Sequence, residues 1–364
     1  MERNEINYKK EFLKIADWLE EGYRLHGGIE GIEKWKRGYY IYSYGIRGLI
    51  VTYKVTGDKK YLERAIEWCN LVIHLQGTVP IKGIPKSMYG YYMGYGGEIV
   101  NGIPYGFYIA DTISMANAIL ATAESIEDKK EKECYISSVK SYADYIISTF
   151  WLEDSGAFTV GVADRKIYLK GVKGKEEFEE YWCATGLGPS LLWWLYDLTN
   201  KEIYRKVAIA NIKWILKYNF FKREEFKRYK VSMIFYICEG LLASYAHLPS
   251  NSKLHQEVKA HLEEVIKWLL SNQTKEGGWY TDIFQWRAKV PGLPLILKWY
   301  YDNIKQDPDI YKAIEKAIQY LTTETSKKEL SMFKDVQTMC FAAISWAYFV
   351  KPESVFPFII SKDE

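Results

Sequence analysis

Apolar side chains recur along the chain at alternating spacings of three and four residues, which place them on one face of an α-helix. Residues 61–75 show this pattern clearly, with a stripe formed by Tyr61, Ala65, Trp68, Val72 and Leu75. The same spacing predicts further amphipathic helices near residues 8–24, 135–146, 203–214, 254–269 and 310–321. Segments that are apolar on all sides alternate with them and predict buried helices, near residues 40–55, 107–124, 183–198, 229–247, 291–304 and 335–350. We therefore expect about twelve helices in six pairs, which is a repeat architecture.

The connections from an apolar helix to the next amphipathic helix are short and alike. TGDKKY at 56–61, TNKEIY at 199–204 and QDPDIY at 306–311 share one length and one terminal tyrosine. Thr, Asp and Asn favour helix N-caps, and Gly57 or Asn200 can adopt the left-handed conformation that ends the preceding helix. These turns indicate an internal repeat of helical hairpins.

The return connections, from an amphipathic helix to the next apolar one, are long and rich in glycine and aromatic residues. They cover residues 77–106, 150–180, 273–290 and 323–334. Long loops in compact domains are usually functional. If the apolar helices form an inner ring, every long loop emerges at the N-terminal ends of those helices, and we expect the functional cleft on that face.

Six hairpins with turns of the TGDKKY type resemble the (α/α)6 toroid of the six-hairpin glycosidase superfamily. In related form, the same fold occurs in terpenoid cyclases and lanthionine cyclases. The resemblance covers nearly the whole chain and implies an all-α fold, with a single (α/α)6 barrel domain over residues 1–364. It is architectural, and such repeats specify the fold far better than the chemistry.

Composition and charge exclude several classes of protein. Apolar residues make up 48% and charged residues 26% of the chain, as in ordinary globular proteins. The 49 basic and 46 acidic residues give a net charge of +3, so we expect neither nucleic acid nor an anionic membrane as a partner. The five cysteines are scattered without CxxC spacing and fit reduced thiols. Because the first ten residues lack the apolar region of a secretory signal, we expect a cytoplasmic protein.

The aromatic content is the unusual feature of the composition. The chain contains 13 Trp, 31 Tyr and 15 Phe residues. Tyr and Trp combine a flat apolar face with a hydrogen-bonding tip, which suits either a large packed core or a sugar-binding cleft. Residues expected near the cleft and proposed for substrate binding are Tyr40, Tyr44, Tyr105, Trp182, Trp279, Trp286 and Arg287.

Asp111 is the main candidate for catalysis. It lies in the opening turns of a predicted inner helix, where the helix N-terminus favours a carboxylate. The run from Asp111 to Met115 resembles the D-x-x-x-M segment of unsaturated glucuronyl and rhamnogalacturonyl hydrolases. In that family an aspartate at such a position protonates a vinyl-ether double bond and activates water, and the resemblance implies this role for Asp111. The alternative is an aspartate that caps the helix or forms a buried hydrogen bond.

The segment SNQTKEGGWYTDIFQWR contains a second set of candidates. Gln273, Gly277 and Trp279 fit a Q-x-x-x-G-x-W pattern common in α/α toroids, whose simplest meaning is a helix stop locked by a tryptophan. Asp282 follows and is expected to serve as the partner carboxylate, because ordinary glycoside hydrolysis requires two opposed carboxyl groups. Arg287 is expected to bind a uronate.

Glu239 is a third candidate acid. It lies halfway along a nearly all-apolar helix, in FYICEGLLASY. An acid in such a position is paired or functional. Structural pairing and catalysis are both open at this point.

Other chemistries of this fold find less support. Cys183 and the Cys238-Glu239-Gly240 segment are faintly similar to the zinc-binding motifs of lanthionine cyclases, but the required histidine is missing, so no metal is expected. The five histidines fall mostly on predicted outer helices or turns, which weakens a sugar epimerase, since that resemblance implies two catalytic histidines. The Asp-rich motifs of terpenoid cyclisation are absent from the sequence.

These observations together predict a glycoside hydrolase that acts on oligosaccharides by carboxylate acid/base catalysis, without a cofactor. Unsaturated uronic acid sugars are the substrate class that the resemblance implies. The alternatives are a non-catalytic carbohydrate-binding or interaction toroid, a sugar epimerase, and a protein similar to terpenoid or lanthionine cyclases. The oligomeric state does not follow from the sequence.

Overall fold

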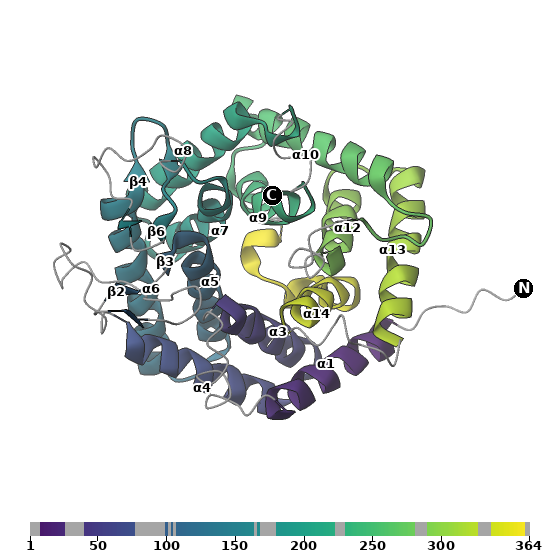
Figure 1. Cartoon of the computed structure of the whole chain (residues 1–364), viewed down its shortest axis with the longest axis horizontal. Coiled ribbons are helices and arrows are strands. Elements are labelled where there is room, and N and C mark those ends of the chain that lie inside the picture. The colour runs from purple at the N-terminus through teal and green to yellow at the C-terminus, as the bar shows by residue number, and fades with distance from the viewer. Residues whose placement is uncertain are drawn as a thin grey trace, which may run out of the picture.

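Two concentric rings of helices make up most of the structure, a computed structural model (Figure 1). It describes residues 8–25, 40–76, 99–100, 103–104, 107–163, 166–167, 180–222, 230–280, 290–326 and 336–360. The outer ring consists of α1 (Tyr8–Leu25), α4 (Lys59–Leu75), α6 (Lys129–Phe150), α8 (Glu202–Tyr218), α10 (Lys253–Asn272) and α13 (Pro308–Ser326). The inner ring consists of α3 (Tyr40–Thr56), α5 (Ile109–Ser125), α7 (Trp182–Thr199), α9 (Lys230–His247), α12 (Leu293–Asn303) and α14 (Val336–Val350). The expected alternation of buried and amphipathic helices, and with it the (α/α)6 toroid, is confirmed.

The short turns between inner and outer helices have the expected local chemistry. Gly57 has a φ of 75°, and the side chain of Asp58 accepts a hydrogen bond from the backbone N–H of Lys60, as an N-cap residue does. Asn200 ends α7 with a φ of 54° and donates its backbone N–H to Tyr196 O at 2.7 Å. A left-handed residue therefore sets the reversal in both turns, and in the first one Asp58 also caps the next helix.

The ring closes where the two ends of the helical array meet. The last inner helix, α14, packs against the first inner helix, α3, and against the outer helix α1. The ring of Tyr8 on α1 lies 5.8 Å from that of Trp346 and 5.9 Å from that of Phe349, both on α14. Closure thus buries apolar surface that a linear array would leave exposed.

Helices α7 and α9 approach each other very closely because glycines face each other at their contact. A Cβ atom added at Gly240 would collide with the backbone carbonyl of Gly186. Nearby, the indole Nε1 of Trp193 on α7 donates to Ser244 Oγ on α9 at 2.9 Å. These contacts position the part of α9 that carries the candidate acid Glu239.

Short antiparallel strands occur in the return connections, where the sequence predicted only long loops. β1 (Ile99–Val100) pairs with β2 (Ile103–Pro104), and β4 (Trp151–Leu152) pairs with β5 (Ala157–Phe158). β6 (Gly161–Ala163) lies between β3 (Phe107–Tyr108) and β7 (Lys166–Ile167). Phe107 pairs with Val162, so the connection before α5 is joined to the one before α7.

The segment after α14 enters the centre of the ring (Figure 1). It contains the short 3-10 helices η7 (Pro352–Ser354) and η8 (Pro357–Ile359), and Val355, Phe356 and Ile359 are buried. Nζ of Lys351 donates to the carbonyl of Lys54 on α3 at 3.0 Å. The end of the chain therefore fills the interior at the level of the inner helices, which the sequence reasoning did not foresee. The remaining 3-10 helices are η3 (Phe220–Lys222) and η5 (Val290–Gly292).

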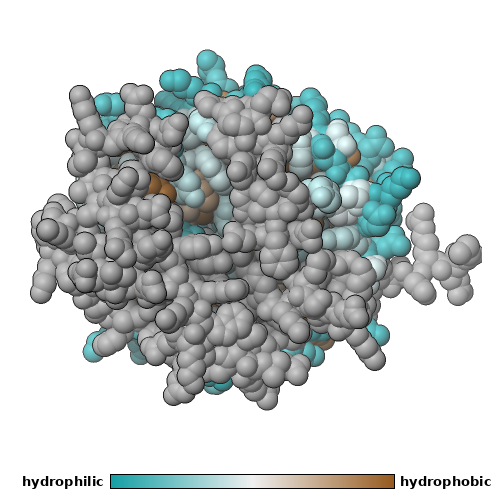
Figure 2. Space-filling model, in the orientation of Figure 1, coloured by the Kyte–Doolittle hydropathy of each residue, from teal (hydrophilic) through white to brown (hydrophobic). Residues whose placement is uncertain are grey.

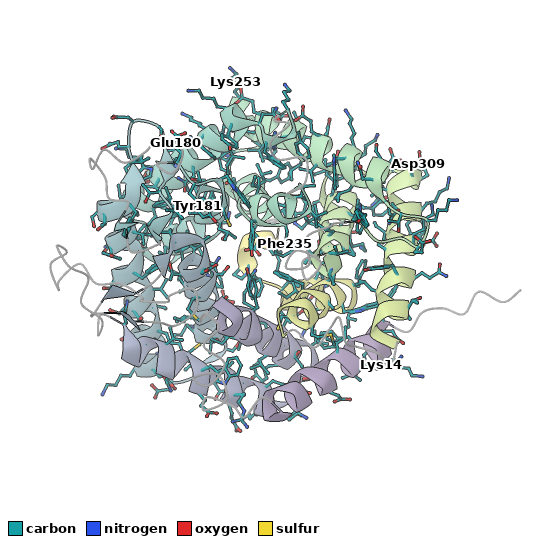
Figure 3. All side chains as sticks on the ribbon, in the orientation of Figure 1. Lys14, Glu180, Tyr181, Phe235, Lys253 and Asp309 are labelled. Carbon is teal, nitrogen blue, oxygen red and sulfur yellow. The ribbon has the colours of Figure 1, made fainter. Side chains whose placement is uncertain are left out.

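The surface follows from the two kinds of helix. Described atoms at the periphery are mostly hydrophilic, and a few hydrophobic ones are visible toward the interior (Figure 2). Lys14, Lys253 and Asp309 project from the outer ring, whereas Phe235 lies near the middle (Figure 3). None of the helices in the described ranges is long and apolar enough to cross a membrane.

A buried histidine between two outer helices gives a first testable result. His261 on α10 lies beside a groove of about 450 Å³ against α8, and burial lowers its pKa although Glu264 opposes the shift. At pH values between the ordinary histidine pKa of 6.5 and the lowered pKa of His261, the unfolded chain therefore binds a proton that the folded chain does not. We expect wild type to lose stability as pH falls through that range, by roughly 1.4 kcal/mol per unit of lowering. The check is urea unfolding of wild type and His261→Gln at several pH values, and a stability difference that does not change with pH would contradict it.

Candidate active site

Asp111 is the third residue of α5, where the N-terminal end of an inner helix meets the preceding connection. Its side chain is partly buried. The first backbone N–H groups of a helix have no partner within it and carry partial positive charge, so they favour a carboxylate in the first turn. Asp111 is the acidic residue of that turn. The expected position at the start of an inner helix is confirmed.

The chain between α6 and α7 holds the starts of α5 and α7 in place. The N–H of Ile109, the first residue of α5, donates to Val160 O at 3.1 Å. The N–H of Tyr181, just before α7, donates to Phe158 O at 2.8 Å, and the N–H of Phe158 donates to Thr185 Oγ1 at 3.0 Å. One short segment therefore forms hydrogen bonds with groups near the starts of both helices. It thereby fixes the position of Asp111 relative to Trp182, the first residue of α7.

Two tyrosines meet across the interior, within electrostatic range of Asp111. The hydroxyls of Tyr44 on α3 and Tyr236 on α9 are 2.9 Å apart and share a hydrogen bond. These helices lie on opposite sides of the inner ring (Figure 1). Burial raises the pKa of both phenols well above the ordinary value, and the nearby Asp111 carboxylate adds to the shift. Both phenols therefore remain protonated hydrogen-bond donors at any physiological pH.

Aromatic rings from two further helices, α7 and α14, flank this pair. The ring of Trp182 lies 6.4 Å from that of Tyr236, and the ring of Phe341 on α14 lies 4.8 Å from that of Tyr44. Trp182 is partly buried, whereas Tyr44 is only 1% exposed. Of these two expected binding residues, Trp182 therefore keeps some exposed surface and Tyr44 keeps almost none.

A buried ion pair lies one helical turn below the tyrosines. Nη2 of Arg47 donates to Oε1 of Glu239 at 2.8 Å, and the two side chains are 1% and 4% exposed. Burial raises the pKa of Glu239 above its usual value, and Arg47 opposes that shift. The guanidinium also lies over the ring of Phe356, 4.5 Å from its centroid. This placement corresponds to structural pairing of Glu239 and gives no support to its expected catalytic role.

Trp279 lies away from this site, in the turn after the outer helix α10. Its indole Nε1 donates to Leu269 O at 2.9 Å, and the residue is 4% exposed. Gln273 in the same turn donates to the carbonyls of Gly277 and Ala313. The ring has no open face for a sugar, so the placement favours the helix-stop interpretation and does not support the substrate-binding expectation for Trp279.

Several expected residues lie outside the described part of the chain. They are Tyr105, Asp282, Trp286 and Arg287. Tyr40 is the first residue of α3, and its side chain is also outside the described set.

The sequence reasoning missed Tyr236 and Arg47. A usable signal existed for Arg47, because it is a basic residue inside the otherwise apolar helix 40–55, just as Glu239 is an acid inside another. Two opposite charges in helices of one core should be paired. Tyr236 gives no comparable signal in a chain with 31 tyrosines.

Metal binding finds no site among the described residues, where no group of three or more His, Cys, Asp and Glu side chains could hold an ion. Cys183 and Cys238, the positions compared with zinc ligands, are both buried free thiols. Burial raises the pKa of the Cys238 thiol, and the carboxylate of Glu239 adds to that shift.

Comparisons with known proteins support the fold. No family model matches the chain, and no curated protein matches it. Among solved structures, cellobiose 2-epimerase from Bacillus thermoamylovorans B4167 is similar with a TM-score of 0.56 and 13% identity, over 79% of this chain and 76% of that one. The unsaturated glucuronyl hydrolase from Bacillus sp. GL1, responsible for the degradation of glycosaminoglycan, also has a TM-score of 0.56, with 12% identity over 88% of each chain. A structure named as UGL with dGlcA-Glc-Rha-Glc gives the same values. At these identities the likeness shows the fold alone.

Proposed function

We propose that this chain is a carbohydrate-active enzyme, a glycoside hydrolase that cleaves oligosaccharides with Asp111 as its general acid/base. The observation that carries the proposal is the arrangement at one end of the inner ring. A partly buried carboxyl group at the start of α5 lies within electrostatic range of two protonated phenols, and a partly buried tryptophan begins the neighbouring helix α7. A carboxyl group, hydroxyl donors and an aromatic face are what an enzyme uses to bind a sugar and move a proton to it.

The proposed reaction regenerates the protonated carboxyl group of Asp111 in each cycle. Asp111 in its protonated form donates a proton to the leaving oxygen, or to the double-bond carbon of an unsaturated uronyl sugar. The resulting carboxylate then takes a proton from the attacking water, which restores the acid. In an ordinary glycoside the bond to the leaving oxygen breaks and the water oxygen ends on the anomeric carbon. In an unsaturated uronyl sugar water adds across the double bond, and the hemiketal formed opens to a ketone and a hemiacetal that releases the second sugar. For an ordinary glycoside a second carboxylate is needed, and Asp282 is proposed for that role. Trp286 and Arg287 in the same segment, with Tyr40 and Tyr105, are proposed to bind substrate.

The tyrosine pair has a defined part in this scheme. One hydroxyl of Tyr44 or Tyr236 donates to the other, so the accepting phenol keeps an O–H to donate elsewhere. A donor next to Asp111 can hold a sugar hydroxyl or steady the carboxylate. Because both phenols have strongly raised pKa values, this donor persists over the whole range in which an acid such as Asp111 titrates.

Hydrolysis is favoured over epimerisation by the positions of the histidines. His255 and His261 lie on the outer helix α10, His74 lies on the outer helix α4, and His247 lies in the last turn of α9, at the far end from Asp111. His247 stacks on Trp193 and contacts Asp197 at 2.9 Å. None of these four is placed beside Asp111 as a histidine acid/base would need to be.

Incubation of the whole chain with unsaturated uronyl disaccharides, aryl glycosides and unmodified disaccharides tests the proposal. We expect release of a reducing sugar from an unsaturated uronyl disaccharide or from an aryl glycoside. The compound that reacts identifies the substrate class. Isomerisation of an unmodified disaccharide without cleavage, followed by NMR, would replace the hydrolase by an epimerase. If no compound reacts but sugars raise the melting temperature, the non-catalytic binding toroid takes the place of the enzyme.

A further inference from the structure

Two side-chain links cross the interior of the barrel between the same pair of helices. Tyr44 meets Tyr236, and Arg47 meets Glu239, so each link joins α3 to α9. In both links the partners are 192 residues apart in the sequence. Each member of the second pair follows its counterpart in the first by three residues, which is about 4.5 Å along a helix. The links are therefore stacked one above the other in the same register.

Among the described residues α3 and α9 do not pack broadly on each other, and the C-terminal segment touches both, through η7 on α3 and η8 on α9. α3 is the first and α9 the fourth inner helix, and they face each other across the ring (Figure 1). α3 packs on α5 and α14, and α9 packs on α7. A hydrogen bond between two hydroxyls tolerates only a few tenths of an ångström of change in distance. Whatever fixes the distance from α3 to α9 thus decides whether the tyrosine pair forms.

The ion pair is built to fix that distance. Its two side chains are buried, where a charge-assisted hydrogen bond is short and strong. The face of Phe356, from the C-terminal segment, seats the guanidinium from one side. A cavity of about 10 Å³, the size of one water molecule, borders the pair, and both Arg47 and Glu239 line it together with apolar residues such as Phe235. Neither charged group can move far without losing its partner.

We propose that Arg47 and Glu239 are positioning residues: their ion pair sets the spacing of α3 and α9 so that the hydroxyls of Tyr44 and Tyr236 meet. The effect on catalysis rests on the proposed function, whereas the effect on the tyrosine pair does not. A mere core contact would stabilise the fold without affecting how Tyr44 and Tyr236 interact. The two possibilities differ in whether the links are energetically coupled.

A double-mutant cycle on thermal unfolding measures that coupling. Tyr44→Phe removes one hydroxyl and is expected to lower Tm by about 2 °C in the wild-type background. In the Arg47→Met/Glu239→Leu background, where the ion pair is replaced by apolar side chains of similar size, the same change should lower Tm by less than about 0.5 °C. The matched control is Lys54→Met/Glu124→Leu, which removes another ion pair of α3, at 3.0 Å and nearer the surface. There Tyr44→Phe should again lower Tm by about 2 °C.

Equal losses in all three backgrounds would overturn the proposal. If the doubly apolar variant does not fold, Glu239→Gln replaces it, because this change keeps the shape and one hydrogen bond while weakening the link. In that background Tyr44→Phe should lower Tm by an amount between about 0.5 °C and about 2 °C. A decrease of about 2 °C there would also overturn the proposal.

The catalytic consequence is measured separately, with the substrate that the compound panel identifies. We expect Arg47→Met/Glu239→Leu to lower kcat by about ten- to a hundredfold with KM within about threefold, because the reacting groups are misplaced rather than removed. The control Lys54→Met/Glu124→Leu should leave kcat unchanged. If wild type turns over nothing, the proposed function fails while the unfolding cycle still decides the positioning role. A coupled cycle with unchanged kcat would instead remove the catalytic half of the proposal.

Discussion

Asp111→Asn is expected to lower kcat by about 10²- to 10⁴-fold on the substrate that the panel identifies, with the helical far-UV spectrum intact. Asparagine has nearly the same shape as aspartate but can neither donate an acidic proton nor accept one. The partly buried side chain at the start of α5 should therefore keep its place and lose only its chemistry. Steady-state kinetics of product release for wild type and variant give the ratio directly.

Asp58→Asn is the matched control for that variant. Asp58 is also an aspartate at a helix N-terminus, but it is exposed and caps the outer helix α4. It therefore lies at the end of the barrel opposite to Asp111. Asparagine is an equally good N-cap residue, so kcat and stability should both stay close to wild type. An Asp111→Asn enzyme that keeps full activity would remove Asp111 from the mechanism and leave Asp282 as the acid to test.

Glu239→Leu is expected to lower the free energy of unfolding by about 3–5 kcal/mol. The change leaves the guanidinium of Arg47, which is 1% exposed and always protonated, without its anion in the interior. Replacement of both partners, in Arg47→Met/Glu239→Leu, should recover most of the loss, because no charge then remains to be desolvated. Urea unfolding followed by circular dichroism provides the three free energies.

The comparison pair is again Lys54 and Glu124, which are 19% and 32% exposed. Water solvates the remaining charge there, so Glu124→Leu should cost no more than about 1 kcal/mol. If Glu239→Leu cost as little as Glu124→Leu, then Arg47 would be reaching solvent or another anion, and the buried pair described here would be wrong.

The helices could be predicted because each one is specified by its own residues. The three-and-four spacing of apolar positions distinguishes amphipathic from buried helices wherever they occur, and all twelve expected segments are helical in the described ranges. The turns could be predicted for the same reason, since Gly57, Asp58 and Asn200 act on backbone atoms only a few residues away. Repetition of one hairpin then leaves few ways to bury the apolar helices other than a closed ring.

The site was predictable only in part. Asp111 and Trp182 were placed correctly at helix starts because a helix boundary is a local feature. Trp279 fits a pattern whose simplest meaning is a helix stop, and it was also proposed for substrate binding because it begins one of the long aromatic connections; in the structure its buried indole locks the turn. The distinction between a tryptophan that locks a turn and one that faces a cleft depends on neighbours distant in sequence.

By itself, the sequence determined which segments are helical, where they reverse, which faces are buried and where an acid would meet a helix start. These properties depend on residues within one or two turns of each other. Only the tertiary structure decided that Tyr44 meets Tyr236, that Arg47 pairs with Glu239, and that the C-terminal segment fills the centre of the ring. Such contacts join residues nearly 200 positions apart, and they are selected by the shared interior that ring closure creates, which no local pattern encodes.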